Sequence, residues 1–225
     1  MAQYLLLILY IVAGSIDCIR ARQSKSRIFK PFLMPLLLAF YVTACRHAQV
    51  PVQPLLIAAL AASFAGDVLL MLTGRHRAFL PAGGLFFALA HVCYVPLFLA
   101  GLSVPRMFRP SLPMIAPLVA VMAGIVMARI VLRRFHGGVR VFFLIYGAFL
   151  FSMCFAASVR VCLTGTVSSV MIFIGALVFI CSDSLLAMNV SETMRGGAPE
   201  RKRPVMQTYL IAQLMITVSH IYQVS

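Results

Sequence analysis

The chain has 225 residues, of which 62% are hydrophobic and only 11% charged, and its mean hydropathy is +1.01. A soluble domain of this size has too little interior to bury so much apolar surface, so the composition excludes a soluble protein and predicts a membrane protein with several spans. Backbone polar groups find no water in lipid, and we therefore expect the spans to be helices.

Eight apolar stretches are long enough to cross a bilayer, and together they predict one integral-membrane domain over residues 1–225. No basic residue precedes Arg20. The first stretch therefore lacks the charged start of a signal peptide, and we expect it to remain as the first span. The predicted fold is an all-α bundle of eight transmembrane helices, at about 3–19, 31–47, 52–73, 80–100, 112–132, 139–158, 167–190 and 205–223.

The basic residues lie mostly in the first, third, fifth and seventh loops between these stretches, and the net charge is +14. This distribution is a topology signal, so no nucleic-acid partner is expected. It predicts that the odd-numbered loops are cytoplasmic and both termini outside, and we expect the inner membrane of a bacterium. Attraction of these loops to anionic lipid headgroups is compatible with the same pattern.

Two of the five acidic residues, Asp67 and Asp183, lie inside apolar stretches. A charge near the bilayer centre costs about 2.5–3.5 kcal/mol on insertion scales, so such a residue is by default a functional candidate. Counted from the ends of their spans at about 1.5 Å per residue, both carboxylates lie roughly 10 Å below the cytoplasmic surface. The short segments around them are alike, which would fit two parallel four-helix halves. A structural alternative is that both acids are protonated and hold helices together by hydrogen bonds.

Other polar side chains on neighbouring spans reach a similar depth. His91 and Tyr94 share one face of the fourth span, Tyr146 lies at a similar depth on the sixth, and the eighth span carries a polar stripe. The candidates for substrate binding or for lining a cavity are Lys30, Ser63, His91, Tyr94, Ser182, Asn189, Tyr209 and Gln213. Gly-x-Ser-x-Gly, His-Glu-x-x-His and a Walker loop are absent, so no cofactor and no metal site are predicted.

Five groups of residues occur in the order found in a known family. They are Lys30-Pro-Phe-Leu-Met-Pro35; Ser63-x-x-Gly-Asp-Val-Leu-Leu-Met71; Phe79-Leu80 with Gly83, Phe86, His91 and Tyr94; Gly175-Ala-Leu-x-Phe-x-x-Ser-Asp-Ser-Leu-Leu-Ala187 with Asn189; and Tyr209-x-x-Ala-Gln213 with Ser219. In these pieces the chain resembles the YhhN-like membrane proteins, which include the animal lysoplasmalogenases. The resemblance implies an eight-helix hydrolase of a lysophospholipid-type substrate in the bilayer. It would cleave the vinyl-ether bond of lysoplasmalogens, releasing a fatty aldehyde and a glycerophospho-amino-alcohol.

Two carboxylates suit that chemistry. Acid hydrolysis of a vinyl ether begins with proton transfer to the alkene carbon, and water then captures the oxocarbenium ion. One carboxylic acid would stay protonated, which desolvation favours, while an ionised partner would stabilise the cation or take a proton from water. We therefore predict Asp67 and Asp183 as the catalytic pair, without assigning which is the acid.

Three other functions remain open at this point. The motifs do not distinguish a vinyl ether from an ester, so hydrolysis of other lysophospholipids is one alternative. A proton-coupled membrane transporter that uses the same two Asp residues as a relay is another. A hydrolase with an Asp and His metal site is the third, although the sequence offers a single deep His for it.

Overall fold

The computed structural model describes residues 2–22, 29–76, 78–102, 115–198 and 201–222. Within these ranges the chain forms α-helices and no strands, which confirms the all-α class. The helices are α1 (Ala2–Arg22), α2 (Lys30–Ala48), α3 (Pro54–Met71), α4 (Phe79–Leu99), α5 (Ile115–Arg134), α6 (Gly137–Thr164), α7 (Val167–Met194) and α8 (Lys202–Tyr222). The beginning of the expected span 112–132 and the end of 205–223 lie outside the described residues.

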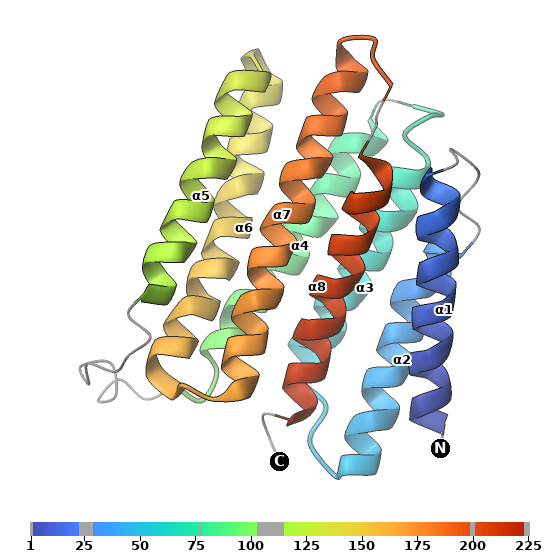
Figure 1. Cartoon of the computed structure of the whole chain (residues 1–225), viewed down its shortest axis with the longest axis vertical. Coiled ribbons are helices and arrows are strands. Elements are labelled where there is room, and N and C mark those ends of the chain that lie inside the picture. Colours follow the sequence, from blue (N-terminus) through green and yellow to red (C-terminus); the bar gives the residue numbers. More distant parts are fainter. Residues whose placement is uncertain (1, 23–28, 77, 103–114, 199–200, 223–225) are drawn as a thin grey trace.

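Seven of these helices, α1 to α7, are long and apolar enough to cross a membrane. The exception is α8, which begins with Lys202 and Arg203 and carries polar side chains such as Gln213 and Thr217. Gln213 and Thr217 are fully buried, and α8 packs against α1, α2 and α7 (Figure 1). A polar face that points into a bundle lowers the hydropathy of a helix without exposing polar groups to lipid. The eighth crossing and the two four-helix halves stay predictions.

The helices lie side by side along one long axis, with α1 and α2 at one side of the bundle and α5 and α6 at the other (Figure 1). The carboxyl ends of α1, α3, α5 and α7 lie at the upper end of that view, and the start of α1 and the end of α8 lie at the lower end. Basic residues such as Arg75, Arg134 and Arg201 belong to the upper end. We call it the basic end. Its orientation relative to the cytoplasm stays a prediction.

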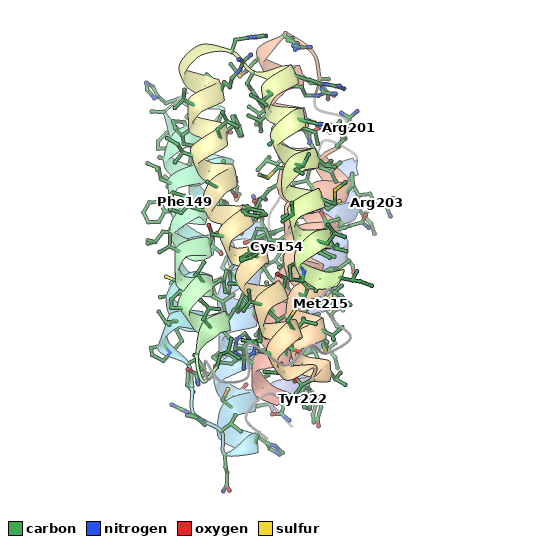
Figure 2. The ribbon with its side chains drawn as sticks, turned by 90° about the vertical axis from the view of Figure 1, so that its left-hand side faces the viewer. Phe149, Cys154, Arg201, Arg203, Met215 and Tyr222 are labelled. Carbon is green, nitrogen blue, oxygen red and sulfur yellow. The ribbon has the colours of Figure 1, made fainter. Side chains whose placement is uncertain are left out.

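The outer surface of the bundle is apolar, as a lipid-facing surface requires. Leu5, Leu118 and Phe149 are exposed large side chains of this surface, and Figure 2 shows Phe149 at the outer edge of the helices. Polar side chains are instead concentrated between helices. The interior of this bundle, rather than its surface, is therefore the place to look for a site.

The packing of α3 against α4 positions the first of the predicted carboxylates. A Cβ atom added to Gly66 would lie 2.7 Å from the ring of Phe87 and 3.1 Å from the carbonyl oxygen of Gly83. Glycines at such a contact allow two membrane helices to approach closely. Asp67, the residue after Gly66, is held at this contact and is 2% exposed.

Candidate functional site

A cavity of about 1090 Å³ lies among α2, α3, α4, α6, α7 and α8. Both predicted carboxylates, Asp67 and Asp183, line it. It extends from them to Thr73 and Gly74, just beyond α3, and to Lys202 at the start of α8, which places it toward the basic end. Much of its wall is apolar and comes from residues such as Leu70, Leu80, Phe87, Phe142, Phe143 and Leu186.

Asp67 lies in a buried cluster that includes the Lys30 ammonium and the Tyr209 phenol. The ammonium Nζ of Lys30 is 2.9 Å from Oδ1 of Asp67, and the hydroxyl of Tyr209 donates a hydrogen bond of 2.9 Å to Oδ2. Lys30 is the first residue of α2 and is followed by Pro31, a residue that suits a helix start. A buried carboxylate without a partner would be strongly unfavourable, so the Lys30 ammonium offsets much of the cost of burying Asp67.

Asp183 has different partners. The hydroxyl of Tyr146 donates a hydrogen bond to Oδ2 of Asp183. Nε2 of His91 lies 3.5 Å from the same Oδ2 and 3.2 Å from the Tyr146 hydroxyl oxygen. The ring of Phe179 packs edge-on against His91, with 4.9 Å between ring centroids. In the described part of the chain, no Lys or Arg forms an ion pair with Asp183.

A third polar cluster lies behind these two, and it links the same helices. The hydroxyl of Tyr94 donates a hydrogen bond of 2.6 Å to Oε1 of Gln213, and Nε2 of Gln213 donates one of 3.0 Å to Oγ of Ser63. Ser63 precedes Asp67 by one turn of α3, and Gln213 follows Tyr209 by one turn of α8. The cluster therefore holds α3, α4 and α8 together one turn beyond Asp67.

The predicted site residues divide into two groups. Asp67, Asp183, Lys30, Ser182, Asn189 and Tyr209 line the cavity. Ser63, His91, Tyr94 and Gln213 are buried behind that lining, where they bond to one another or to lining residues. Ser182 donates to the carbonyl oxygen of Val205 at 3.1 Å, so its hydroxyl links α7 to α8.

Two features of the site were missed by sequence reasoning. The first is the bond of Tyr146 to Asp183. The depth of Tyr146 was readable from hydropathy, but the rotation of α6 that turns it toward α7 was not. The second is Lys202, which looked like a loop charge and in fact lines the cavity. Its position would have been indicated only if the eighth helix had been predicted to begin at residue 202 rather than at 205.

Within the described residues, no group of three or more His, Cys, Asp and Glu side chains is arranged to hold a metal ion. The fold and cavity define an all-helical membrane protein with two carboxylates at one internal cavity. The model of the YhhN family matches residues 25–220, and the chain therefore belongs to the YhhN family. No curated protein and no solved structure matches the chain.

Proposed function

We propose that the protein is a membrane-embedded hydrolase that cleaves the vinyl-ether bond of lysoplasmalogens. The products would be a fatty aldehyde and a glycerophospho-amino-alcohol. The observation that carries the proposal is that Asp67 and Asp183 line one cavity and have different partners, Lys30 for the first and Tyr146 with His91 for the second. Membership of the YhhN family supports a membrane protein of this kind. The choice of a vinyl ether follows what the resemblance to the lysoplasmalogenases implies, and two unlike carboxylates suit its acid hydrolysis.

The partners suggest a role for each acid. An ammonium at 2.9 Å favours the ionised form of the Asp67 carboxylate. Asp67 is therefore assigned to stabilise the cationic intermediate and to accept a proton from water. Asp183 has a phenol and an imidazole as neighbours, with no Lys or Arg paired to it in the described residues. It is assigned as the acid that supplies the first proton, with His91 positioned to return a proton to it.

The reaction then runs in three steps. Asp183 transfers its proton to the alkene carbon that does not carry oxygen, which leaves an oxocarbenium ion beside the Asp67 carboxylate. Water adds to the cationic carbon and gives its proton to a carboxylate, forming a hemiacetal. The hemiacetal loses its hydroxyl proton as the ether oxygen gains one, the bond between carbon and ether oxygen breaks, and the aldehyde and the alcohol separate. This division of labour parallels that of glycosidases, which also pass through an oxocarbenium-like state.

The shape of the cavity supports a substrate with one chain. Its apolar wall, which includes Phe87, Phe142 and Leu186, suits an alkenyl chain, while its polar lining surrounds the carboxylates. Ligand sites commonly combine such an apolar wall with a few placed polar groups. A volume of about 1090 Å³ lies just above the usual range for small-molecule sites.

The test is hydrolysis by the purified protein of a 1-alkenyl lysolipid and of the matching acyl lysolipid, with aldehyde and free fatty acid measured separately. Asp67→Asn and Asp183→Asn should each lower aldehyde release by roughly 10²–10⁴-fold, the range for loss of a general acid or base. Asp17→Asn is the matched control. Asp17 is a buried acid outside the cavity whose Oδ1 accepts from the backbone N–H of Phe29 at 3.2 Å, and an amide oxygen preserves this bond.

Unchanged aldehyde release in both variants would overturn the carboxylate mechanism. Fatty acid from the acyl lysolipid without aldehyde from the alkenyl one would indicate a hydrolase of other lysophospholipids. Proton-coupled solute uptake into vesicles that depends on both Asp residues, with neither product formed, would indicate the transporter.

A further inference from the structure

Among the described residues, two lysines line the cavity, and they differ in what their ammonium groups contact. Lys30 is paired with Asp67 at 2.9 Å and lies deep in the bundle. A substrate-binding role for Lys30, predicted from the sequence, therefore competes with a strong internal ion pair. Lys202 is half-buried at the start of α8 and takes part in none of the ion pairs formed among the described residues. Among the described residues that line the cavity, Lys202 is thus the cation available to a ligand.

The basic residues on either side of Lys202 in the sequence do not share this position. The guanidinium of Arg201 pairs with Glu192, and neither Arg201 nor Arg203 belongs to the cavity lining. Figure 2 places Arg201 and Arg203 toward the upper end of the bundle. Arg201 precedes α8. Successive residues of a helix point in directions about 100° apart, which explains why Arg203 does not face the cavity as Lys202 does.

Asn189 supplies a second polar group to the same end of the cavity. It is 6% exposed, lines the cavity, and uses its Oδ1 to accept a 3.0 Å hydrogen bond from the backbone N–H of Arg201. This bond fixes Asn189 beside the start of α8. It leaves the side-chain NH₂ as the group with donors to offer, because no described residue accepts from it. An ammonium and an amide NH₂ are both donors, and such a pair suits an anion with several oxygens.

The spacing along both helices relates this end of the cavity to the carboxylates. Lys202 precedes Tyr209, the partner of Asp67, by seven residues, which is about 10 Å along α8 at about 1.5 Å per residue. Asn189 follows Asp183 by six residues, about 9 Å along α7 by the same rise. Lys202 on α8 and Asn189 on α7 therefore lie at a similar distance, measured along the helices, from the level of the carboxylates. A glycerol unit with its phosphate bridges a separation of this order.

We propose that Lys202 and Asn189 form a phosphate subsite at the basic end of the cavity, which binds the phosphodiester of a lysolipid headgroup. The inference rests on the proposed function and adds to it the part of the substrate that the protein recognises. The phosphate binds at Lys202, the ether bond lies at Asp67 and Asp183, and the chain follows the apolar wall. Inorganic phosphate and glycerophosphodiesters share the recognised group, and the test separates them from the lipid.

The first arm of the test compares two substrates with the same alkenyl chain, a 1-alkenyl-glycerophosphoethanolamine and the phosphate-free 1-alkenylglycerol. Lys202→Gln should raise the KM for the phosphorylated substrate by about 10-fold or more, the amount expected for one charge-assisted hydrogen bond. The change for 1-alkenylglycerol should be much smaller, and Lys202→Arg should recover most of the loss. Arg203→Gln, which removes the same charge one residue away, is the matched control and should change both KM values less than about twofold.

Two results of this arm would overturn the subsite. One is an equal rise in KM for both substrates in Lys202→Gln. The other is an equal effect of Arg203→Gln, because a general attraction of the basic end for anionic lipid would explain it. Aldehyde release that persists in either case leaves the proposed hydrolase function intact.

The second arm measures binding without turnover, by the shift in thermal unfolding of the purified protein with an acyl lysophosphatidylethanolamine and with a monoacylglycerol of the same chain. The subsite predicts a larger shift with the phosphorylated lipid, and Lys202→Gln should abolish the difference. This outcome, with no hydrolysis of any substrate, would support the subsite while the proposed function fails. If inorganic phosphate or glycerophosphoethanolamine alone gives the full shift, the assignment to a lipid headgroup is overturned.

Discussion

The two acids of the cavity illustrate how identical side chains acquire different properties from their neighbours. Asp67 has the Lys30 ammonium on one oxygen and the Tyr209 hydroxyl on the other. Asp183 has a phenol and an imidazole at a single oxygen. Hydropathy alone identified both acids, since each interrupts an apolar stretch. Their partners come from other helices, at sequence separations that no local pattern reports.

The ion pair between Lys30 and Asp67 should be a major determinant of stability. Lys30→Met removes the cation that lies 2.9 Å from a buried carboxylate, so we expect a loss of about 3–5 kcal/mol of unfolding free energy. The measurement is chemical unfolding of the purified protein in mild detergent. The double variant Lys30→Met/Asp67→Asn removes both charges and should recover most of the loss. A double variant as unstable as the single one would contradict this account.

Tyr146 and Tyr94 are both buried phenols that donate to a side-chain oxygen, yet they should respond differently to loss of the hydroxyl. Tyr146→Phe removes a donor that orients Asp183, and we expect roughly a 10²-fold loss of aldehyde release from misplacement of the acid. Tyr94→Phe leaves Oε1 of Gln213 without its donor, so it should cost about 1–3 kcal/mol of stability with a smaller effect on rate. Reaction rates and unfolding midpoints of the two variants check this. Equal losses of rate would contradict the assignment of Tyr146 to the reaction site and of Tyr94 to structural support.

At the scale of the helices, hydropathy predicted the class and the approximate positions of the elements but not their lengths. Both α6 and α7 run for 28 residues and extend beyond the expected spans 139–158 and 167–190. Their ends carry polar residues such as Arg160 and Glu192. A hydropathy criterion excludes such residues from a membrane span, but an α-helix can continue through them. Arg160 donates to the carbonyl oxygens of Phe98 and Ala100 at the end of α4, so a buried cation there caps a neighbouring helix.

The rotation of each helix about its axis is the property that the sequence left undetermined. The polar stripe of α8 was predictable from its spacing, but its hydrogen bonds to α3 and α4 depend on how three helices pack. The same reason explains why four predicted site residues, Gln213 among them, lie behind the cavity lining rather than in it. The depth of a side chain in the membrane follows from counting residues along its helix, whereas the direction in which it points follows from tertiary contacts.

The contact of α3 with α4 at Gly66 gives a test at this scale. The added methyl group of Gly66→Ala would meet the Phe87 ring at 2.7 Å, so the helices must separate or the ring must move. We expect a loss of about 1–3 kcal/mol in unfolding free energy, the range for overpacking, together with reduced hydrolysis because Asp67 follows Gly66. Gly138→Ala is the control, since nothing lies within 4 Å of its added Cβ. Equal stability of the two variants would show that the α3–α4 contact tolerates a wider spacing.

For the whole molecule, the distribution of charge and the direction of the helices agree. The carboxyl ends of α1, α3, α5 and α7 share one end of the bundle, where the basic residues gather, and the start of α1 and the end of α8 lie at the other (Figure 1). The predicted eight crossings would produce this arrangement. The cavity lies toward the basic end, so the positive-inside rule would place its phosphate subsite at the cytoplasmic leaflet.

The topology depends on whether α8 crosses the membrane, because α8 is less hydrophobic than the seven helices that are apolar enough to span it. Reporter domains fused after Ala198 and after Ser225 in a bacterial host test it directly. If α8 crosses, a fluorescent protein should be bright after Ala198 and dark after Ser225, while alkaline phosphatase should show the reverse. The expectation follows because Gln213, Thr217 and His220 are buried against other helices, so the face that α8 turns to lipid is apolar. The same signal from both fusion sites would mean that α8 does not cross, and the reversed pattern would place the basic end outside.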